Sequence, residues 1–479
     1  MDHLHAPIVP INPLSVVRSS PDTAGTAAQV RCASSDMRQD NADDSCRAPA
    51  VSIYMEDAVK DLEVVEICAG AGGQALGLEL AGFQHRLAIE LDPNAARTLS
   101  VNLEDKRGIL PGMIVKCGDV ADPEVWRPSE HGGVALLAGG VPCPPFSVAG
   151  KQLGADDERD LFAWAVEQVQ FVRPKVLLLE NVRGLSLPRF AGYRQHVLDR
   201  LREFKYVGEW RLLEACEFGV PQLRPRFVLV ALQEEYAPYF HWPDPRRSAP
   251  TVGEALADLM AADGWEGAEA WAAKANKIAP TIVGGSKKHG GADLGPTRAK
   301  RAWAELGVDA LGVADFPPQP GQTFVVGPKL TCEMVARIQG WAGDYEWEFT
   351  GRKTSRYRQI GNAFPPPVAH ALGISIAAAL RKIGVPRERD ISAEHDAIYR
   401  ALRDGGDYMT AAQLIKATGL DLETPELERR ISVLGHDFHI DIRNGESPAA
   451  YKIGEFRGFI GQDDHQRHRL FLQHRARIS

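Results

Sequence analysis

A single cysteine, Cys143, lies in the stretch GGVPCPPFSVAG (139–150), between prolines and small residues. A lone cysteine is ordinarily a small buried hydrophobe. Here an apolar run (134–138) precedes the stretch, and the prolines and glycines favour a stiff, closely approached loop. We therefore interpret Cys143 as a nucleophile that the loop presents at the edge of a sheet.

Two further groups could share a cleft with this thiol. Glu180 ends the apolar run KVLLLEN (175–181), and Arg224 and Arg226 open the run RFVLVAL (226–232). Taken separately, Glu180 could be a helix cap or a surface acid, and the arginines could be surface charge. Together, a carboxyl group can protonate a ring nitrogen, and arginine charge can favour a thiolate.

A glycine-rich turn, EICAGAGG (66–73), follows the first apolar run, while Glu90 and Asp119 end the second and third. An acid at the end of the second strand can accept from both hydroxyls of a ribose, and Asp119 can accept from an adenine amino group. The turn has Gly-x-Gly-Gly rather than Gly-x-Gly-x-x-Gly, so a pyrophosphate is not the expected ligand. S-adenosylmethionine, which has a ribose and an adenine but no phosphate, fits better.

A thiol, a carboxyl group, a cationic pair and a methyl donor in one cleft suit methylation of cytosine at carbon 5. That carbon is too electron-poor to attack a sulfonium methyl group directly. A thiolate that adds at carbon 6 converts the ring into an enamine, and a proton at ring nitrogen 3 eases the addition. The stiff loop would hold the nucleophile under the base.

The order of the motifs resembles that of the DNA (cytosine-5-)-methyltransferase family over residues 62–380. EICAGAGG resembles the family's first motif, GGVPCPPFSVAGK its nucleophile loop and ENVRGL its glutamate motif. ACEFGVPQLRPRFVLVA (215–231) resembles the paired-arginine motif and the segment before it. KLTCEMVARIQGW (329–341) and YRQIGNAFPPPVAHALG (357–373) resemble the last two motifs.

This resemblance implies a role for each matching residue. Cys143 would be the nucleophile, Glu180 the partner of nitrogen 3, and Arg226 with Arg224 the pair that holds the base. Ser147 would contact the DNA backbone. The implied S-adenosylmethionine site consists of Ile67, Cys68, Ala69, Gly70, Gly72, Gly73, Glu90, Leu91, Asp119, Val120, Pro142, Leu161, Asn362 and Ala363.

The sequence departs from the family pattern in two places. The first motif usually begins Asp-Leu-Phe, but here it is Glu66-Ile67-Cys68, which lacks the aromatic ring expected to pack on adenine. Pro144 stands where glutamine is commoner. None of the polar groups assigned to the chemistry is missing, so the resemblance implies an active enzyme.

Six apolar runs are expected to be the strands that position these groups, with helical spacing between several of them. The runs are 62–67, 85–91, 112–119, 134–140, 175–181 and 226–232. Buried strands that alternate with helices predict an α/β fold with a parallel sheet covered on both faces. We expect a Rossmann-like S-adenosylmethionine-dependent methyltransferase domain.

Composition divides the chain into further segments. Residues 1–58 are rich in Ala, Ser, Asp and Pro and are expected to be a disordered extension, in which Met55 is an alternative start. The remaining expected segments are a catalytic domain (59–242), a small irregular target recognition domain (243–328), the C-terminal part of the catalytic domain (329–385), a winged-helix module of three helices and a hairpin (390–460), and a basic tail (461–479).

Charge and cysteine content limit the class of protein. The net charge of −8 argues against a protein that coats nucleic acid indiscriminately. Seven scattered cysteines without a C-x-x-C pair indicate reduced thiols and no metal site. The chain lacks a secretory signal and an apolar run of roughly 18 residues, so we expect a cytoplasmic, nucleoid-associated bacterial monomer without a membrane segment.

A basic island interrupts the acidic chain. Seven Lys or Arg residues lie between Lys274 and Arg301, with Asp293 as the one acid. Such a stretch could contact phosphates, or it could be a solvated loop. The candidate DNA-binding residues are Ser147, Lys287, Lys288, Arg298, Lys300 and Arg301.

The sequence therefore predicts methylation of a flipped cytosine in duplex DNA, in a restriction–modification system with a cognate restriction endonuclease as a candidate partner. Three alternatives stay open. The same chemistry could act on a transfer RNA, or an inactive domain could serve a DNA-binding regulator. A nicotinamide oxidoreductase could use the same glycine turn, although it would not explain the cysteine loop.

Overall fold

The structure is a computed structural model that describes residues 62–141, 159–245, 248–284, 292–388, 396–435, 437–443 and 448–456. The predicted extension (1–58) and basic tail (461–479) lie outside these ranges. So do five predicted site residues: Pro142, Cys143, Ser147, Lys287 and Lys288.

Seven strands form the central sheet in the order β3-β2-β1-β4-β5-β7-β6. The strands are β1 (Glu63–Ile67), β2 (Gln84–Glu90), β3 (Val115–Cys117), β4 (Leu136–Gly139), β5 (Val176–Val182), β6 (Tyr206–Glu214) and β7 (Pro225–Gln233). β1 to β5 are mutually parallel where they pair, but β7 runs antiparallel to both β5 and β6. The sheet is therefore mixed, and the prediction of a parallel sheet was wrong at β7.

The sequence analysis also missed β6, for a physical reason. β6 is an edge strand, and most of its residues are half-buried or exposed, so it does not form an apolar run. A short connection of ten residues joins it to β7, which is compatible with antiparallel neighbours but not with a helical crossover.

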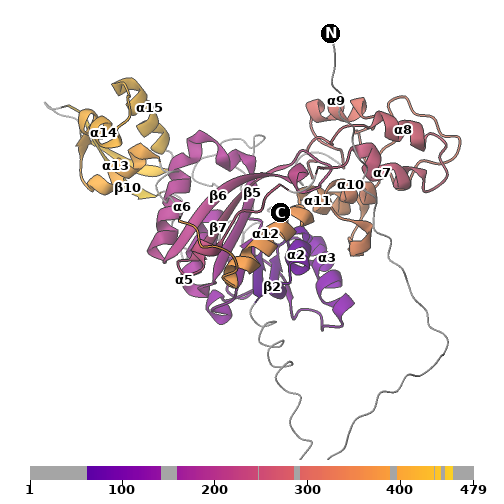
Figure 1. Ribbon diagram of the computed structural model, residues 1–479, viewed down its shortest axis with the longest axis horizontal. Helices are drawn as coiled ribbons and strands as arrows, with labels where there is room; N and C mark the ends of the chain where they lie inside the picture. Colours follow the sequence, from indigo (N-terminus) through magenta and orange to yellow (C-terminus); the bar gives the residue numbers. More distant parts are fainter. Residues whose placement is uncertain are drawn as a thin grey trace, which may run out of the picture. The chain divides into compact units, whose positions relative to one another are not determined.

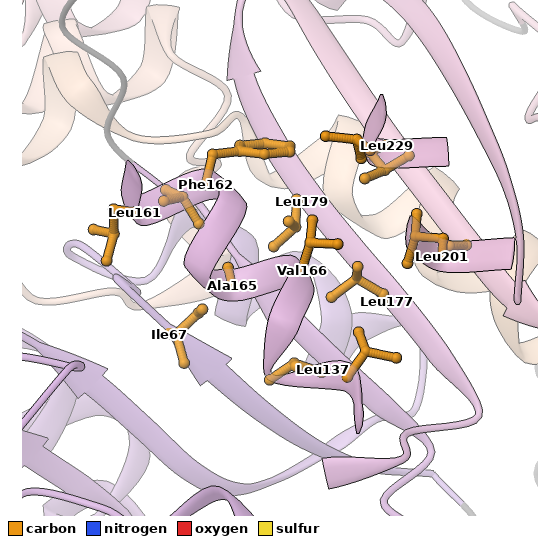
Figure 2. Close-up of a cluster of buried hydrophobic side chains, with 14 of the residues drawn as sticks. Ile67, Leu137, Leu161, Phe162, Ala165, Val166, Leu177, Leu179, Leu201 and Leu229 are labelled. Carbon is orange, nitrogen blue, oxygen red and sulfur yellow. The ribbon is translucent and has the colours of Figure 1, made fainter. Parts of the chain in front are cut away.

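The sheet is covered by helices on both faces, as predicted. Successive residues of β5, such as Leu177 and Leu178, point to opposite faces of the sheet and belong to two different hydrophobic clusters. One cluster packs against α4 (Arg159–Glu167) and α6 (Ala191–Glu203), and Figure 2 shows Phe162 and Val166 of α4 among the strand side chains. The other packs against α2 (Gly73–Leu80) and α12 (Pro366–Leu380).

The other helices of the described residues before position 389 lie between the strands or in the segment after β7. They are α3 (Pro93–Leu103), α5 (Val169–Val172), α7 (Val252–Ala261), α8 (Ala268–Lys274), α9 (Thr297–Glu305), α10 (Cys332–Ile338) and α11 (Lys353–Asn362). Single 3-10 turns occur at Asp105–Arg107, Pro128–His131, Arg183–Ser186, Pro188–Phe190, Ala215–Glu217, Ala237–Tyr239 and Gly343–Tyr345.

α2 and α12 lie side by side (Figure 1). They pack closely because Gly77 of α2 faces the small residue Ala369 of α12. A methyl group on Gly77 would lie 2.5 Å from the Ala369 Cβ and the Pro366 carbonyl oxygen. Among the described residues, Lys353–Leu380 is long and apolar enough to cross a membrane by length and composition alone. It comprises two helices, however, and 61% of its most apolar window is buried, so we assign α12 to the protein core.

The predicted target recognition segment, 243–328, is less irregular than expected, since it contains α7, α8 and α9. A capping box at Thr251 starts α7. One hydrophobic cluster joins these helices to α10 and α11, through Trp271, Trp303 and Tyr357. A single core therefore spans the predicted boundary at residue 328.

Three helices and a three-stranded sheet form the C-terminal module (yellow in Figure 1). They are α13 (Ala397–Gly405), β8 (Met409–Thr410), α14 (Ala411–Thr418), α15 (Thr424–Leu434), β9 (Phe438–Arg443) and β10 (Ala450–Phe456). The sheet order is β8-β10-β9. The three helices precede the pair β9 and β10, as the sequence predicts, but the short strand β8 after the first helix was not predicted.

The module packs against α6 of the catalytic domain through aromatic rings. The His196 ring stacks on Phe456 with centroids 4.6 Å apart and meets Phe438 edge to face at 5.4 Å. Its Nδ1 lies 3.3 Å from the Tyr399 hydroxyl. Burial lowers the pKa of His196 to about 3, so this ring is neutral at physiological pH.

The contact between α2 and α12 predicts that Gly77→Ala destabilises the protein. The added methyl group would meet backbone atoms at 2.5 and 2.7 Å, which a rotamer change does not relieve. We expect the free energy of unfolding to fall by about 1–3 kcal/mol, despite the better helix propensity of alanine.

Denaturant unfolding of Gly77→Ala checks this expectation. Gly132→Ala is the matched control, because Gly132 has an extended conformation and the nearest atom to an added methyl group is 3.8 Å away. Equal stabilities for both variants would contradict the close packing.

Candidate active site

The carboxyl ends of the parallel strands meet at one edge of the sheet, and the predicted polar residues gather there. Ile67 and Glu90 end β1 and β2, Asp119 follows β3, and Glu180 lies near the end of β5. Because β7 is antiparallel, its beginning lies at the same edge, and Arg226 is paired with Val182. Ligands of open α/β sheets bind at this edge.

Glu180 and Arg226 form a buried ion pair at this edge. The Arg226 Nε and the Glu180 Oε1 are 2.5 Å apart, and Glu180 is 9% exposed. Burial raises the pKa of Glu180, while the charges of Arg226 and Arg224 oppose that rise. Because the pKa of Glu180 is raised overall, a larger fraction of this residue is protonated than in an exposed glutamate. A protonated carboxyl group can donate a proton.

Arg224, two residues before Arg226, is also buried, but its hydrogen-bond partners are backbone carbonyls rather than a carboxyl group. It is 2% exposed, and its Nη1 and Nη2 donate to the backbone carbonyls of Ile282, Gly361 and Ala363 at 2.8, 2.7 and 3.1 Å. Gln222 provides a further acceptor at 3.3 Å. Arg224 thus joins the start of β7 to two distant parts of the chain, whereas Arg226 meets the carboxyl group.

The described part of the nucleophile loop approaches Glu180 from β4. A methyl group on Gly140 would lie 3.5 Å from the Glu180 Oε2 and 3.6 Å from the Cys68 carbonyl oxygen. Asn181 donates from its Nδ2 to the carbonyl of Val141, the last residue of the described range, at 3.1 Å. The structure therefore brings the entry to this loop beside both Glu180 and the glycine turn.

The glycine turn after β1 has the left-handed backbone that its sequence permits. Gly70 and Gly72 have φ angles of +59° and +89°, and Cys68 also has a positive φ of +50°. The Gly70 amide donates to the Glu90 Oε2 at 2.8 Å, and the Asp92 amide donates to the Glu90 Oε1 at 2.8 Å. These bonds fix the Glu90 carboxylate at the turn.

The remaining predicted cofactor residues divide into edge and core positions. Asp119 accepts from the Ala121 amide at 2.9 Å, which orients its carboxylate after β3. Val120, Ile67 and Leu161 belong to the hydrophobic cluster on the α4 face, where Figure 2 shows Ile67 and Leu161. Leu91 is half-buried. The edge positions can contact a ligand, and the core positions support them.

Asn362 and Ala363, from the end of α11, reach the same edge from far along the chain. The Ala363 Cβ would lie 3.1 Å from a methyl group on Gly73, the first residue of α2. Asn362 is exposed, and its side chain lies directly against Gly284. These two residues therefore lie between the glycine turn and the segment that leads into residues 285–291.

Three of the candidate DNA-binding residues in the basic island are described. Arg298 and Arg301 are exposed on α9, whereas Lys300 is half-buried and forms an ion pair with Asp293 at 2.8 Å. The charge of Lys300 is thus partly compensated within the protein, and Arg298 and Arg301 present theirs to solvent.

Buried amide side chains that the sequence does not predict also hold this site together. Gln222 donates from its Nε2 to the Gln339 Oε1 at 2.6 Å, and Gln339 donates to the Ala363 carbonyl at 2.7 Å. Asn181 lies within the glutamate motif, directly after Glu180, but its type and position predict no role for it. Buried amide side chains leave no spacing signal, so only tertiary contacts identify them.

Arg224→Lys is expected to lower the free energy of unfolding by about 2–4 kcal/mol, because at least two buried carbonyls lose their donors at about 1–3 kcal/mol each. Arg86→Lys is the control, since Arg86 is exposed and pairs with Glu63 at 3.4 Å. That variant should change stability by less than about 1 kcal/mol. Thermal unfolding of both checks the difference, and equal effects would refute the anchoring role of Arg224.

Comparisons with known proteins agree with this geometry. Residues 62–378 match the family model of the C-5 cytosine-specific DNA methylases. The type II methyltransferase M.NaeI of Lentzea aerocolonigenes is 69% identical over 421 residues, which cover 88% of this chain and 100% of the relative. M.NgoMIV of Neisseria gonorrhoeae is 49% identical over 322 residues, or 66% of this chain and 98% of the relative. The chain belongs to the family of C-5 cytosine-specific DNA methylases.

Proposed function

We propose that this methylase transfers a methyl group from S-adenosylmethionine to carbon 5 of a cytosine flipped out of a specific duplex sequence. We also propose that it protects bacterial DNA in a restriction–modification system, as a cytoplasmic monomer with a cognate restriction endonuclease. The identity to two type II methyltransferases supports this role. The observation that carries the mechanism is the buried pair of Glu180 and Arg226 beside the glycine turn.

The residues at the sheet edge fit S-adenosylmethionine. No atom lies within 4 Å of a methyl group placed on Gly70, so the turn has room for a ligand. Glu90 is oriented by two amides and would accept from the ribose hydroxyls, and Asp119 would accept from the adenine amino group. Asn362 and Ala363 would close the site from the other side. The bound cofactor supplies an electrophilic methyl group.

Glu180 and Arg226 act on the cytosine ring in this proposal. The raised pKa of Glu180 favours the neutral acid, which can donate to nitrogen 3 of a flipped base. Arg226 would donate to the oxygen at carbon 2 and would stabilise negative charge as the ring is attacked. The contacts of Arg224 with three carbonyls support a positioning role for it, rather than a direct contact with the base.

Cys143 is the proposed nucleophile. Its thiolate would add to carbon 6 and the ring electrons would move to carbon 5. Carbon 5 would then bond to the methyl group while the bond from that methyl group to the sulfonium sulfur breaks and leaves its electron pair on the sulfur. Loss of the proton at carbon 5 and of the thiolate from carbon 6 then restores the double bond and frees the enzyme. The contact of Asn181 with Val141 supports this assignment, because it anchors the loop entry beside Glu180.

Target recognition is proposed for residues 243–328. The proposed catalytic domain consists of the segments on either side, 59–242 and 329–385. A base inside a duplex is inaccessible, so the cytosine must be flipped into the cleft. Lys287, Lys288, Arg298, Lys300, Arg301 and Ser147 are the proposed backbone contacts.

For the C-terminal module we propose a winged-helix fold, supported by the order α13-β8-α14-α15-β9-β10. Its aromatic contact with α6 favours a role in stabilising the catalytic domain over a role as a freely moving DNA reader. Arg403 adds an ion pair to Glu203 of α6 at 2.9 Å.

The first experiment incubates the enzyme with radiolabelled S-adenosylmethionine and either duplex DNA or total RNA, followed by nucleoside analysis. We expect 5-methylcytosine in DNA alone. Label in RNA alone would favour the transfer RNA alternative, and cofactor binding without label would favour the inactive regulator.

Cys143→Ser should abolish the DNA label, by at least about a thousandfold, because an alcohol is a far weaker nucleophile than a thiolate. DNA binding should remain measurable. Cys332→Ser is the control, since Cys332 is half-buried at the start of α10. Turnover by Cys143→Ser close to that of the control would remove the nucleophile assignment.

Replacing both Arg298 and Arg301 by Gln should weaken DNA binding and flatten its salt dependence, by about 0.9 in the slope for each lost phosphate contact. Binding titrations at several salt concentrations measure this slope. Lys300→Gln should have a smaller effect, because Asp293 already compensates Lys300. An unchanged slope in the double variant would place the phosphate contacts elsewhere.

A further inference from the structure

A segment without regular secondary structure, 346–350, lies along α3 and is firmly attached to it. Asn102 of α3 donates to the Glu348 carbonyl at 2.8 Å and accepts from the Glu348 amide at 3.0 Å. The Thr350 amide donates to the Thr98 hydroxyl at 2.9 Å. Since Asn102 and Thr98 are both buried, these bonds hold the segment in one place.

This attachment places Trp347 against the glycine turn. The Trp347 Nε1 donates to the Ala71 carbonyl at 3.0 Å, although the two residues are 276 positions apart. A methyl group on Gly72 would collide with the indole and would lie 2.9 Å from Leu99. The ring also packs against a hydrophobic cluster that includes Ala69 of the turn, Ala75 and Leu99.

The glycine turn needs such a support. Cys68, Gly70 and Gly72 all have positive φ angles, and Gly70 must present its amide to Glu90. Glycine has the largest conformational freedom of any residue, and a positive φ costs free energy at a residue with a side chain. Trp347 contacts the turn on the side of Gly72, whereas a methyl group on Gly70 would meet open space.

We propose that Trp347 is a positioning residue of the cofactor site, which holds the glycine turn in its binding conformation through the Ala71 carbonyl and the face of Gly72. The proposal rests on the proposed function, because it assigns the turn to S-adenosylmethionine. It gives the segment 346–350 a role in cofactor affinity, although this segment lies almost 280 residues after the turn.

Trp347→Phe is the decisive variant, because it keeps a ring on Gly72 but removes the donor to Ala71. We expect the dissociation constant for S-adenosylmethionine, measured by calorimetry, to rise about three- to fivefold. Trp347→Ala should raise it at least about tenfold, because the turn loses the ring as well. The KM for the cofactor should rise in parallel, while kcat at saturating cofactor stays within about twofold of the wild type.

Trp265→Phe and Trp265→Ala are matched controls. Trp265 is also half-buried and donates from its Nε1 to a backbone carbonyl, that of Gln322, at 3.0 Å, but it lies in the 243–328 segment. These variants should leave cofactor affinity unchanged. Thermal unfolding of all four variants separates loss of affinity from loss of fold.

A folded Trp347→Phe with wild-type cofactor affinity would overturn the proposal, even if Trp347→Ala failed to fold. A loss of kcat without a change in KM would also overturn it, since that pattern indicates damage to the chemistry and not to cofactor binding. Failure of the proposed function itself would appear separately, as a wild-type enzyme that binds no S-adenosylmethionine.

Discussion

The arrangement of the site depends on a guanidinium group that is buried among carbonyl groups. Arg224 donates to the carbonyl of Ile282 and to those of Gly361 and Ala363, which belong to two distant segments of the chain. A buried polar group without a partner costs about 1–3 kcal/mol, so neither segment can withdraw without a loss of stability. The position of Asn362 at the sheet edge follows from this constraint.

The reversed direction of β7 is what brings opposite charges together at the same edge. If β7 were parallel to β5, its first residues would lie at the other end of the sheet, far from Glu180. Because β7 is antiparallel to β5, the start of β7 lies beside the end of β5, and Arg226 pairs with Glu180. Burial raises the pKa of that carboxyl group and the adjacent arginine limits the rise, so the two groups together set its protonation.

Small residues allow the two ends of the catalytic domain to meet. Gly73 and Gly77 of α2 have no room for a methyl group, because Ala363, Phe364 and Ala369 pack directly against them. Larger residues would separate α2 from α12 and would move the last motif away from the glycine turn. The glycines of the first motif therefore serve helix packing as well as backbone conformation.

The sequence by itself determined the local features: the glycine turn, most of the strands, and the chemical groups that could perform methyl transfer. These follow from residue type and short-range pattern, which is why Glu90 and Glu180 were found at strand ends. Assignment of the family came from motif order, and the family match confirmed it.

Only the tertiary structure decided which of those groups meet, because that depends on contacts between distant residues. The two arginines belong to one sequence motif, but the structure gives them different partners. Arg226 pairs with Glu180, whereas Arg224 donates to backbone carbonyls. The structure also revealed β6, whose half-exposed residues have no apolar pattern, and Trp347, which reaches the turn from the far end of the catalytic domain. Sequence spacing carries no record of such long-range packing.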